Sequence, residues 1–395
     1  MVTSSRSTSQ TTSQYTPAFD QISPRQRQAL VALLKPAGIS INGPQPWDIQ
    51  LNDPQALSRI VREGSLGLGE SYMEGQWSCE RLDILFERAL RAGLDHRLQR
   101  LGWQQWLLQT LANPQSILRS RQVGLAHYDL GNRFFASMLD SRMTYTCGYW
   151  LRARNLEEAQ LAKLDLICRK LGLQPGMRLL DIGCGWGSLM RYAAERYGVE
   201  CVGLTISKEQ AEYGSQLMGD LPVRFEFADY REYQPSRAQS FDRIASVGMF
   251  EHVGHKNYEA YFNTVSRCLK PDGLCLLHTI GKNRPAAGTD PWINRYIFPN
   301  GEIPALSQIM PAIDGRFVVE DLHNFGCDYD HTLMAWHENF EQHWPQLKSR
   351  YDERFYRMWR YYLLSCAGAF RARSLQLWQL VLSPHGVEQG YRRHN

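Results

Sequence analysis

The sequence predicts an α/β protein: a parallel sheet covered by helices, preceded by a smaller, mostly helical amino-terminal domain. Strand and helix patterns alternate from His127 to the carboxyl-terminal part of the chain. Residues 23–118 show mostly helical patterns interrupted by Gly and Pro. A length of 395 residues is itself enough for two domains.

The amino-terminal part is expected to hold three segments. Residues 1–20 are rich in Ser, Thr and Gln and lack the apolar stretch of a signal peptide, so they are expected to be a disordered tail. Residues 21–113 are expected to form the helical domain, with a glycine-rich turn at residues 64–69. Residues 114–126 are expected to link it to a catalytic domain spanning residues 127–395.

The second domain is predicted from alternating strands and helices. The strand candidates are Arg178–Ile182, Glu200–Thr205, Val223–Phe227, Phe241–Val247 and Gly273–Ile280. The helix candidates are Leu156–Leu171, Ser188–Tyr197, Lys208–Met218 and Asn257–Leu269. Strands separated by helices favour a parallel sheet, whose ligand binds outside the carboxyl ends of the strands.

A glycine turn follows the first of these strands. Asp181 is followed by Gly183, Gly185 and Gly187, and a helical pattern then begins. Such glycines let a ligand approach the backbone closely. The chain lacks the Gly-x-x-x-x-Gly-Lys-Ser/Thr pattern, which argues against a triphosphate site. The alternative is an ordinary strand–helix turn, but the spacing resembles motif I of S-adenosylmethionine (SAM) methyltransferases and so favours a Rossmann-like sheet.

The end of the second strand departs from the usual nucleoside-binding pattern. An acidic residue is common there, whereas this chain has Thr205, with Gln210 in the next helix. A threonine can hydrogen-bond a hydroxyl or a carboxylate but brings no charge. This departure argues against a generic methyltransferase.

Composition limits the remaining classes of function. The net charge of +4 is too small to indicate nucleic-acid binding by itself. The nine cysteines are scattered, without Cys-x-x-Cys or a metal-like cluster with histidine, so no metal site is predicted and a reducing compartment is favoured. No apolar run reaches the length of a membrane span.

Residues 88–121 form a basic segment with six arginines, one acidic residue and two tryptophans. This composition is typical of a helix that lies on a membrane surface. A helix that packs on the core and exposes its arginines to water explains it equally well, and the sequence leaves both interpretations open.

Seven motifs resemble those of the cyclopropane-fatty-acyl-phospholipid synthases, over a region from about Ile39 to the carboxyl terminus. They occupy residues 64–72, 145–150, 180–187, 247–254, 277–281, 296–301 and 324–330. The resemblance to the bacterial two-domain enzymes includes residues 64–72, which the mycobacterial members lack. It implies addition of the SAM methyl carbon across a cis double bond of a phospholipid acyl chain, with a bound bicarbonate as the base.

The resemblance also implies the site residues. The bicarbonate cage carries over to Cys147, Glu251, His278, Ile280 and Tyr329. The SAM contacts carry over to Tyr145, Thr146, Asp181, Gly183, Gly185, Thr205, Gln210, Asp229 and Tyr230. The implied partners are unsaturated membrane phospholipids and a second copy of the chain, and the implied location is cytoplasmic, peripheral on the inner face of the membrane.

Taken singly, these residues have simpler explanations. Glu251 can favour the start of a helix, and Cys147, His278 and Tyr329 fit an ordinary core. Two other functions stay open: a SAM-dependent methyltransferase that makes methyl-branched lipids or methylates a small molecule, and a non-catalytic membrane-surface protein. The first would not need the cage, and the second would not need the SAM motifs.

Overall fold

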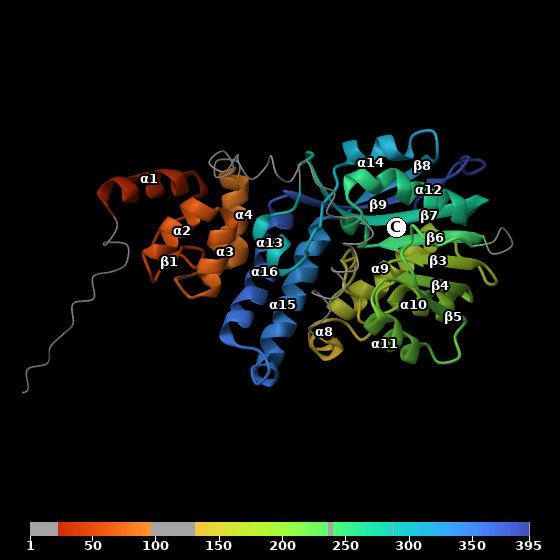
Figure 1. Ribbon diagram of the computed structural model, residues 1–395, viewed down its shortest axis with the longest axis horizontal. Helices are drawn as coiled ribbons and strands as arrows, with labels where there is room; N and C mark the ends of the chain where they lie inside the picture. The colour runs from red at the N-terminus through yellow and green to blue at the C-terminus, as the bar shows by residue number, and fades with distance from the viewer. Residues whose placement is uncertain (1–22, 96–130, 236–239, 287, 395) are drawn as a thin grey trace, which may run out of the picture.

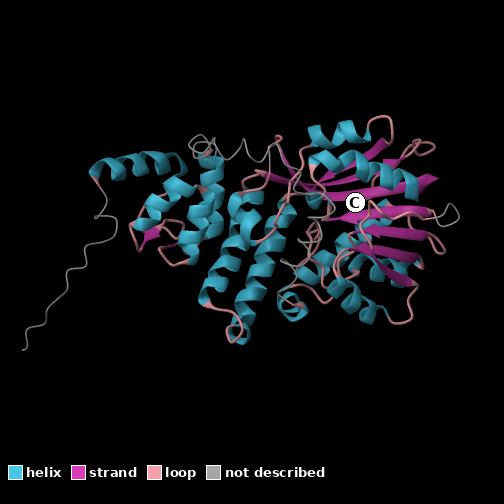
Figure 2. Ribbon diagram, in the orientation of Figure 1, coloured by secondary structure: helices cyan, strands magenta, loops and turns pink. Residues whose placement is uncertain are grey.

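The computed structural model describes residues 23–95, 131–235, 240–286 and 288–394. The expected tail (1–20), the expected linker (114–126) and residues 96–121 of the basic segment lie outside the described residues. The described elements form three groups along the long axis: the amino-terminal helices, a central set of long helices, and the sheet (Figure 1). Figure 2 shows that most of the strands gather at one end of the molecule, while a short strand lies among the amino-terminal helices.

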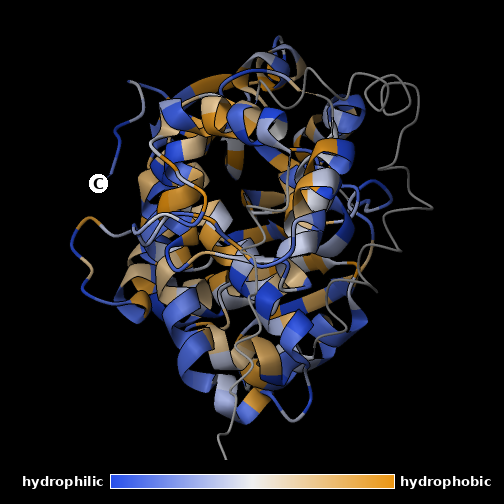
Figure 3. Cartoon of the chain, turned by 90° about the vertical axis from the view of Figure 1, so that its left-hand side faces the viewer, coloured by the Kyte–Doolittle hydropathy of each residue, from blue (hydrophilic) through white to orange (hydrophobic). Residues whose placement is uncertain are grey.

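The described amino-terminal region is mostly helical, as predicted. Its helices are α1 (Pro24–Leu34), α2 (Gln55–Glu63), α3 (Ser65–Met73) and α4 (Leu82–Arg91), with the short 3-10 helix η2 (Lys35–Ala37). Two short strands, β1 (Gln50–Leu51) and β2 (Trp77–Ser78), pair antiparallel. Figure 3 shows that the helices on this side carry both hydrophobic and hydrophilic residues.

The expected glycine-rich turn at residues 64–69 is wrong, because residues 65–69 belong to helix α3. Only Gly64, with φ +61°, has the backbone of a turn. The glycines inside the helix instead allow close packing. A Cβ on Gly67 would lie 2.5 Å from the Arg59 carbonyl oxygen, and one on Gly69 would lie 2.3 Å from Cδ1 of Trp292.

The sheet has seven described strands in the order β5-β4-β3-β6-β7-β9-β8. They are β3 (Arg178–Ile182), β4 (Glu200–Thr205), β5 (Val223–Phe227), β6 (Phe241–Val247), β7 (Leu269–Lys282), β8 (Val318–Asn324) and β9 (Leu375–Ser383). The first four match the predicted strands, and β7 extends beyond the predicted one. β3 to β7 pair in parallel, so their carboxyl ends meet at one edge.

The expectation of a purely parallel sheet is incomplete. β9 pairs antiparallel with both β7 and β8, and neither β8 nor β9 was among the predicted strands. β9 follows a pair of long helices and returns between two strands that precede it in sequence (Figure 1). This long-range pairing, rather than a local strand–helix alternation, determines its direction.

Helices cover both faces of the sheet. They include α9 (Leu156–Lys170), α10 (Ser188–Tyr197), α11 (Lys208–Met218), α12 (Tyr258–Cys268) and α14 (Leu306–Ile313), with the 3-10 helices η4 (Phe250–His252) and η5 (His255–Asn257). Local signals fix several of their ends. The Asn155 side chain caps α9 by accepting from the Glu158 N–H, and Gly198, with φ +63°, ends α10.

A third group of helices joins the sheet to the amino-terminal domain. It contains α8 (Asn132–Met138), α13 (Pro291–Tyr296), α15 (Cys327–Leu347) and α16 (Glu353–Arg371). One hydrophobic cluster contains Tyr72 and Trp77 of the amino-terminal domain together with Trp292 and Tyr361. The ring centroids of Trp292 and Tyr361 are 4.5 Å apart. The amino-terminal domain therefore shares its core with α13 and α16.

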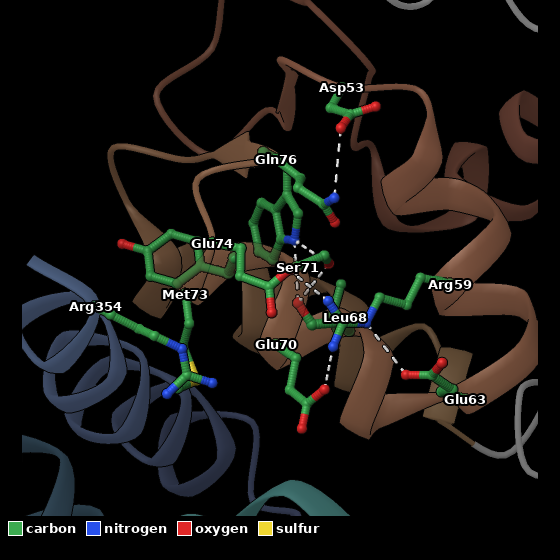
Figure 4. A network of polar contacts seen from close by, with 12 residues as sticks. Asp53, Arg59, Glu63, Leu68, Glu70, Ser71, Met73, Glu74, Gln76 and Arg354 are labelled. Carbon is green, nitrogen blue, oxygen red and sulfur yellow. Dashed lines mark hydrogen bonds and ion pairs between the residues drawn. The ribbon is translucent and has the colours of Figure 1, made fainter.

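Polar contacts surround this shared core. Arg59 of α2 pairs with Glu63, Glu70 and Glu74, and Arg354 of α16 points toward the network (Figure 4). The Tyr296 hydroxyl donates to Glu70 at 2.7 Å and accepts from Arg354 at 3.2 Å. No helix within the described ranges combines the length and hydrophobicity needed to cross a bilayer.

Candidate active site

The glycine turn lies at the carboxyl end of β3. Gly183, Gly185 and Gly187 have φ values of +82°, +55° and +83°, which favour glycine. A Cβ on Gly185 would meet no atom within 4 Å, so the backbone there is open to a ligand. By contrast, a Cβ on Gly183 would lie 2.5 Å from Cγ of Met249, so this glycine permits close packing of the next loop.

Asp181, at the start of this turn, is buried and only 2% exposed. Its Oδ1 atom has no hydrogen-bond partner within the described ranges. Burial raises the pKa of this carboxyl to about 7, and the charge of Lys163 opposes the rise. A buried carboxylate oxygen without a partner is costly, so Asp181 is suited to receive a donor from a ligand.

The second and third strands place the other predicted SAM residues at the same edge. Thr205 lies 3.3 Å from Gln210 (Oγ1 to Oε1), so the structure brings these two side chains together. Asp229 already pairs with Arg231, with an Oδ2–Nη2 distance of 2.6 Å. Tyr230 packs edge-on against Tyr261, and burial raises its pKa.

The loop before α9 carries Tyr145 and Thr146. The Tyr145 hydroxyl lies 3.0 Å from the Tyr362 hydroxyl, and its ring packs on Trp336. The Thr146 hydroxyl accepts a 2.7 Å hydrogen bond from Nζ of Lys163. A Cβ on Gly248 would lie 2.6 Å from the Thr146 methyl group, so this loop touches the carboxyl end of β6.

Glu251 lies at the carboxyl end of β6, in η4. Its Oε1 atom accepts a 2.7 Å hydrogen bond from the backbone N–H of Ile280, which joins two of the predicted cage residues directly. Its Oε2 atom is buried without a partner in the described part of the chain. Burial raises the pKa of Glu251 to about 7, although the Ile280 hydrogen bond opposes this rise.

His278 lies two residues before Ile280 on β7, on the same face of the strand. It is 1% exposed, and burial, followed by the charges of Lys163 and Lys170, lowers its pKa well below the usual range. The Gln379 amide donates to its Nδ1 at 3.2 Å, which places the proton of the neutral ring on Nε2. Nε2 is buried and has no partner among the described residues, so its N–H is a hydrogen-bond donor without an acceptor.

Cys147 lies against the first turns of α15, the helix that carries Tyr329. The Cys147 thiol is fully buried and lies 3.8 Å from the Thr332 hydroxyl. Burial raises its pKa well above the usual range, which argues against a thiolate nucleophile. Burial also raises the pKa of Tyr329, and the negative charge of an ionised Glu251 raises it further. The hydroxyl of Tyr329 therefore keeps its proton and can donate it in a hydrogen bond.

The first turn of α15 also fixes the loop that carries Cys147. Asp328 accepts from the Trp150 N–H at 2.7 Å, and the Thr332 hydroxyl accepts from the Gly148 N–H at 3.0 Å. The sequence interpretation missed Thr332, Gln379 and Lys163. For Lys163 a signal existed: it falls on the apolar side of α9, in line with Ala159, Leu166 and Ile167, which are also buried.

Comparisons with known proteins agree with this arrangement. The sequence profile of the family described as "Mycolic acid cyclopropane synthetase" matches residues 115–380. The chain is 54% identical over 362 residues to the "Cyclopropane-fatty-acyl-phospholipid synthase" of Escherichia coli strain K12, covering 91% of this chain and 94% of the relative.

Solved structures give the same result. The cyclopropane synthase MmaA2 from Mycobacterium tuberculosis superposes with a TM-score of 0.61 at 35% identity, covering 66% of this chain and 97% of its own. The mycolic acid cyclopropane synthase CmaA1 complexed with SAH and CTAB gives the same values: TM-score 0.61, 35% identity, 66% and 97% coverage. The chain is thus a SAM-dependent enzyme and belongs to the cyclopropane synthase family.

Proposed function

We propose that the protein transfers the methyl carbon of SAM to the cis double bond of an unsaturated acyl chain in a membrane phospholipid and closes a cyclopropane ring. The glycine turn, Asp181, Thr205 and Gln210 bind SAM, together with Tyr145 and Thr146. The adenine end lies toward Asp229 and Tyr230. S-adenosylhomocysteine and the cyclopropane lipid are the products.

One observation carries the proposal: buried polar atoms without partners lie next to the predicted SAM residues. Glu251 Oε2 and His278 Nε2 are both unpartnered within the described ranges, and both belong to the carboxyl-terminal edge of the sheet. Native proteins rarely leave such atoms unsatisfied, so a small polar group is expected between them. A methyltransferase acting on a strong nucleophile would not need this group.

Bicarbonate fits these atoms. It has acceptor oxygens for the His278 N–H and the Tyr329 hydroxyl, and a hydroxyl for Glu251. When bound, it supplies the base that takes the proton released from the new methyl group during ring closure. Glu251, held by the Ile280 N–H, orients it through the free Oε2 atom. Cys147 closes the site as a buried neutral group and forms no covalent bond.

The surroundings suit an alkene, which is a weak nucleophile. Attack on the sulfonium methyl group develops positive charge on the acyl chain, which water would quench. Buried aromatic side chains near Tyr145 present electron-rich faces that stabilise a cation and exclude water. The same burial keeps the hydroxyls of Tyr329 and Tyr362 protonated, because it raises the pKa of both.

Mass spectrometry of the lipids tests the proposal. Unsaturated phospholipid vesicles are incubated with the protein, with and without SAM. Ring formation adds about fourteen mass units by formula and removes the alkene only when SAM is present. A product that has gained a methyl group but is a branched chain, or that still contains a reactive alkene, would show that the protein methylates the lipid without closing a ring. Unchanged lipid with an active SAM-binding site would refute the acyl-chain substrate.

We further propose a homodimer that works as a peripheral protein on the inner face of the membrane, with the amino-terminal domain engaging lipid. The supporting features are the basic, tryptophan-containing composition of residues 88–121 and the family membership. Light scattering tests the dimer. Vesicle sedimentation of the full chain, compared with a full-length variant in which the arginines of the basic segment are replaced by glutamine, tests the lipid contact. Equal binding of both would contradict the role of this domain.

A further inference from the structure

Lys163 is a buried ammonium group at the predicted SAM site to which no role has been given above. It lies in α9 and is 1% exposed. Within the described ranges its hydrogen bond goes to Thr146 Oγ1, at 2.7 Å. Burying an ammonium charge is costly unless it is paired. One of the three N–H groups of Lys163 binds Thr146, so two are available for another acceptor.

The bond from Lys163 also fixes the direction of the Thr146 hydroxyl proton. Lysine can only donate, so the Thr146 oxygen must accept, and its own proton must point elsewhere. Thr146 thus becomes a donor directed away from Lys163. The backbone of this loop is held separately, because the Gln160 amide donates to the Thr146 carbonyl oxygen at 2.7 Å. Lys163 is therefore not required merely to anchor the loop.

Lys163 and Asp181 carry opposite charges that influence each other. Burial disfavours the ionised carboxylate of Asp181, and the positive charge of Lys163 favours it. Burial lowers the pKa of Lys163 to about 8, whereas the carboxylates of Asp140 and Asp181 favour its charged form. Asp140 is occupied by the Thr144 N–H at 2.7 Å, whereas Asp181 Oδ1 has no partner in the described part of the chain.

We infer that Lys163 is a positioning residue that recognises the carboxylate of the methionine end of SAM, acting through the Thr146 hydroxyl, while Asp181 takes the ammonium group of the same end. The inference rests on the proposed function. The methionine end is a zwitterion, and a buried cation beside Thr146 and a buried anion at the glycine turn match its two charges.

The test compares two ligands on three proteins by calorimetry. The ligands are SAM and decarboxylated SAM, which keeps the sulfonium and the amine but lacks the carboxylate. The proteins are the wild type, Lys163→Met and Lys163→Gln; the glutamine can still donate to Thr146 but has no charge. Lys348→Met, at an exposed position, is the matched control. The measured quantity is the ratio of the affinities for the two ligands.

The wild type and Lys348→Met are expected to prefer SAM, and both Lys163 variants are expected to reduce this preference by roughly ten- to a hundredfold. Any effect of the variants on Asp181 acts on both ligands equally and cancels in the ratio. If both variants weaken the two ligands alike, Lys163 is structural and the inference fails. If the wild type itself binds neither SAM nor S-adenosylhomocysteine, the proposed function fails instead.

Discussion

Arg371 joins three elements, and its removal is expected to destabilise the protein strongly. At the end of α16 it binds Asp330 of α15 through two hydrogen bonds of 2.8 Å, and Asp83 of α4 through a third of 2.8 Å. The exposed fractions of the Arg371, Asp330 and Asp83 side chains are 25%, 14% and 1%. Replacement by leucine leaves both carboxylates in place without their shared partner.

The size of the effect follows from these contacts. Burial by itself would raise the pKa of Asp83, but hydrogen bonds from Arg81 and Arg371 outweigh burial and hold it at about 2. Relative to an ordinary aspartate, this corresponds to about 2.5 kcal/mol of stabilisation, shared between the two arginines. Adding the two partly exposed hydrogen bonds to Asp330, Arg371→Leu is expected to lower the free energy of unfolding by about 2–4 kcal/mol.

Urea unfolding at pH 7.5 measures this loss, with Arg62→Gln as the control. Arg62 also pairs with a carboxylate, Glu63, but its side chain is 72% exposed, so a loss below about 1 kcal/mol is expected. Adding Asp330→Asn to Arg371→Leu should recover part of the loss, because Asp330 then has no charged partner among the described residues, whereas Asp83 keeps its two hydrogen bonds from Arg81. The wild-type contribution of Asp83 is present above pH 4 and disappears as the pH falls toward 2. A loss for Arg371→Leu no larger than that of the control would refute this reasoning.

Three further outcomes are expected. Asp181→Ala should abolish SAM binding in a folded protein, as calorimetry and circular dichroism would show; unchanged affinity would contradict the role of Asp181. Glu251→Gln should reduce turnover by roughly a hundred- to ten-thousandfold while SAM still binds. Bicarbonate depletion should slow the wild type, with recovery on addition, and a wild type fully active without bicarbonate would leave a protein side chain as the base. Replacing four arginines of the basic segment with glutamine should weaken sedimentation with anionic vesicles and reduce its salt sensitivity; unchanged sedimentation would show that these side chains are only a solvated surface. The four are Arg97, Arg100, Arg119 and Arg121.

The sequence predicts most of the sheet because its signals there are local. β3 to β6 and helices α10 and α11 have the predicted bounds, and each is defined by its own apolar pattern and by nearby glycine or cap residues. β9 could not be predicted in the same way, since its neighbours are chosen by contacts distant in sequence. The glycines of α3 were misinterpreted for a similar reason: Trp292, which explains Gly69, lies far along the chain.

The site shows the same division between local and distant information. The motifs locate Glu251, His278 and Ile280 at strand ends, but the hydrogen bond from the Ile280 N–H to Glu251 depends on the pairing of β6 with β7. Lys163 resembles any surface lysine when helix residues are considered singly. The apolar pattern of α9 indicates that Lys163 is buried, but its contact with the Thr146 loop becomes visible only after the helix is placed on the sheet.

The ionisation states of the cage residues limit which group can act as the base in ring closure. Burial raises the pKa of Cys147 and Tyr329 and lowers that of His278, so these groups stay neutral near pH 7. Among the five predicted cage residues, only Glu251 has a pKa near this range, at about 7. One of its oxygens is already held by Ile280, which leaves one oxygen to contact either the substrate or a bound anion. The base supplied by this cage is therefore either Glu251 itself or an anion that Glu251 orients. The His278 N–H has no acceptor among the described residues and no function toward an alkene, so its presence favours a bound anion.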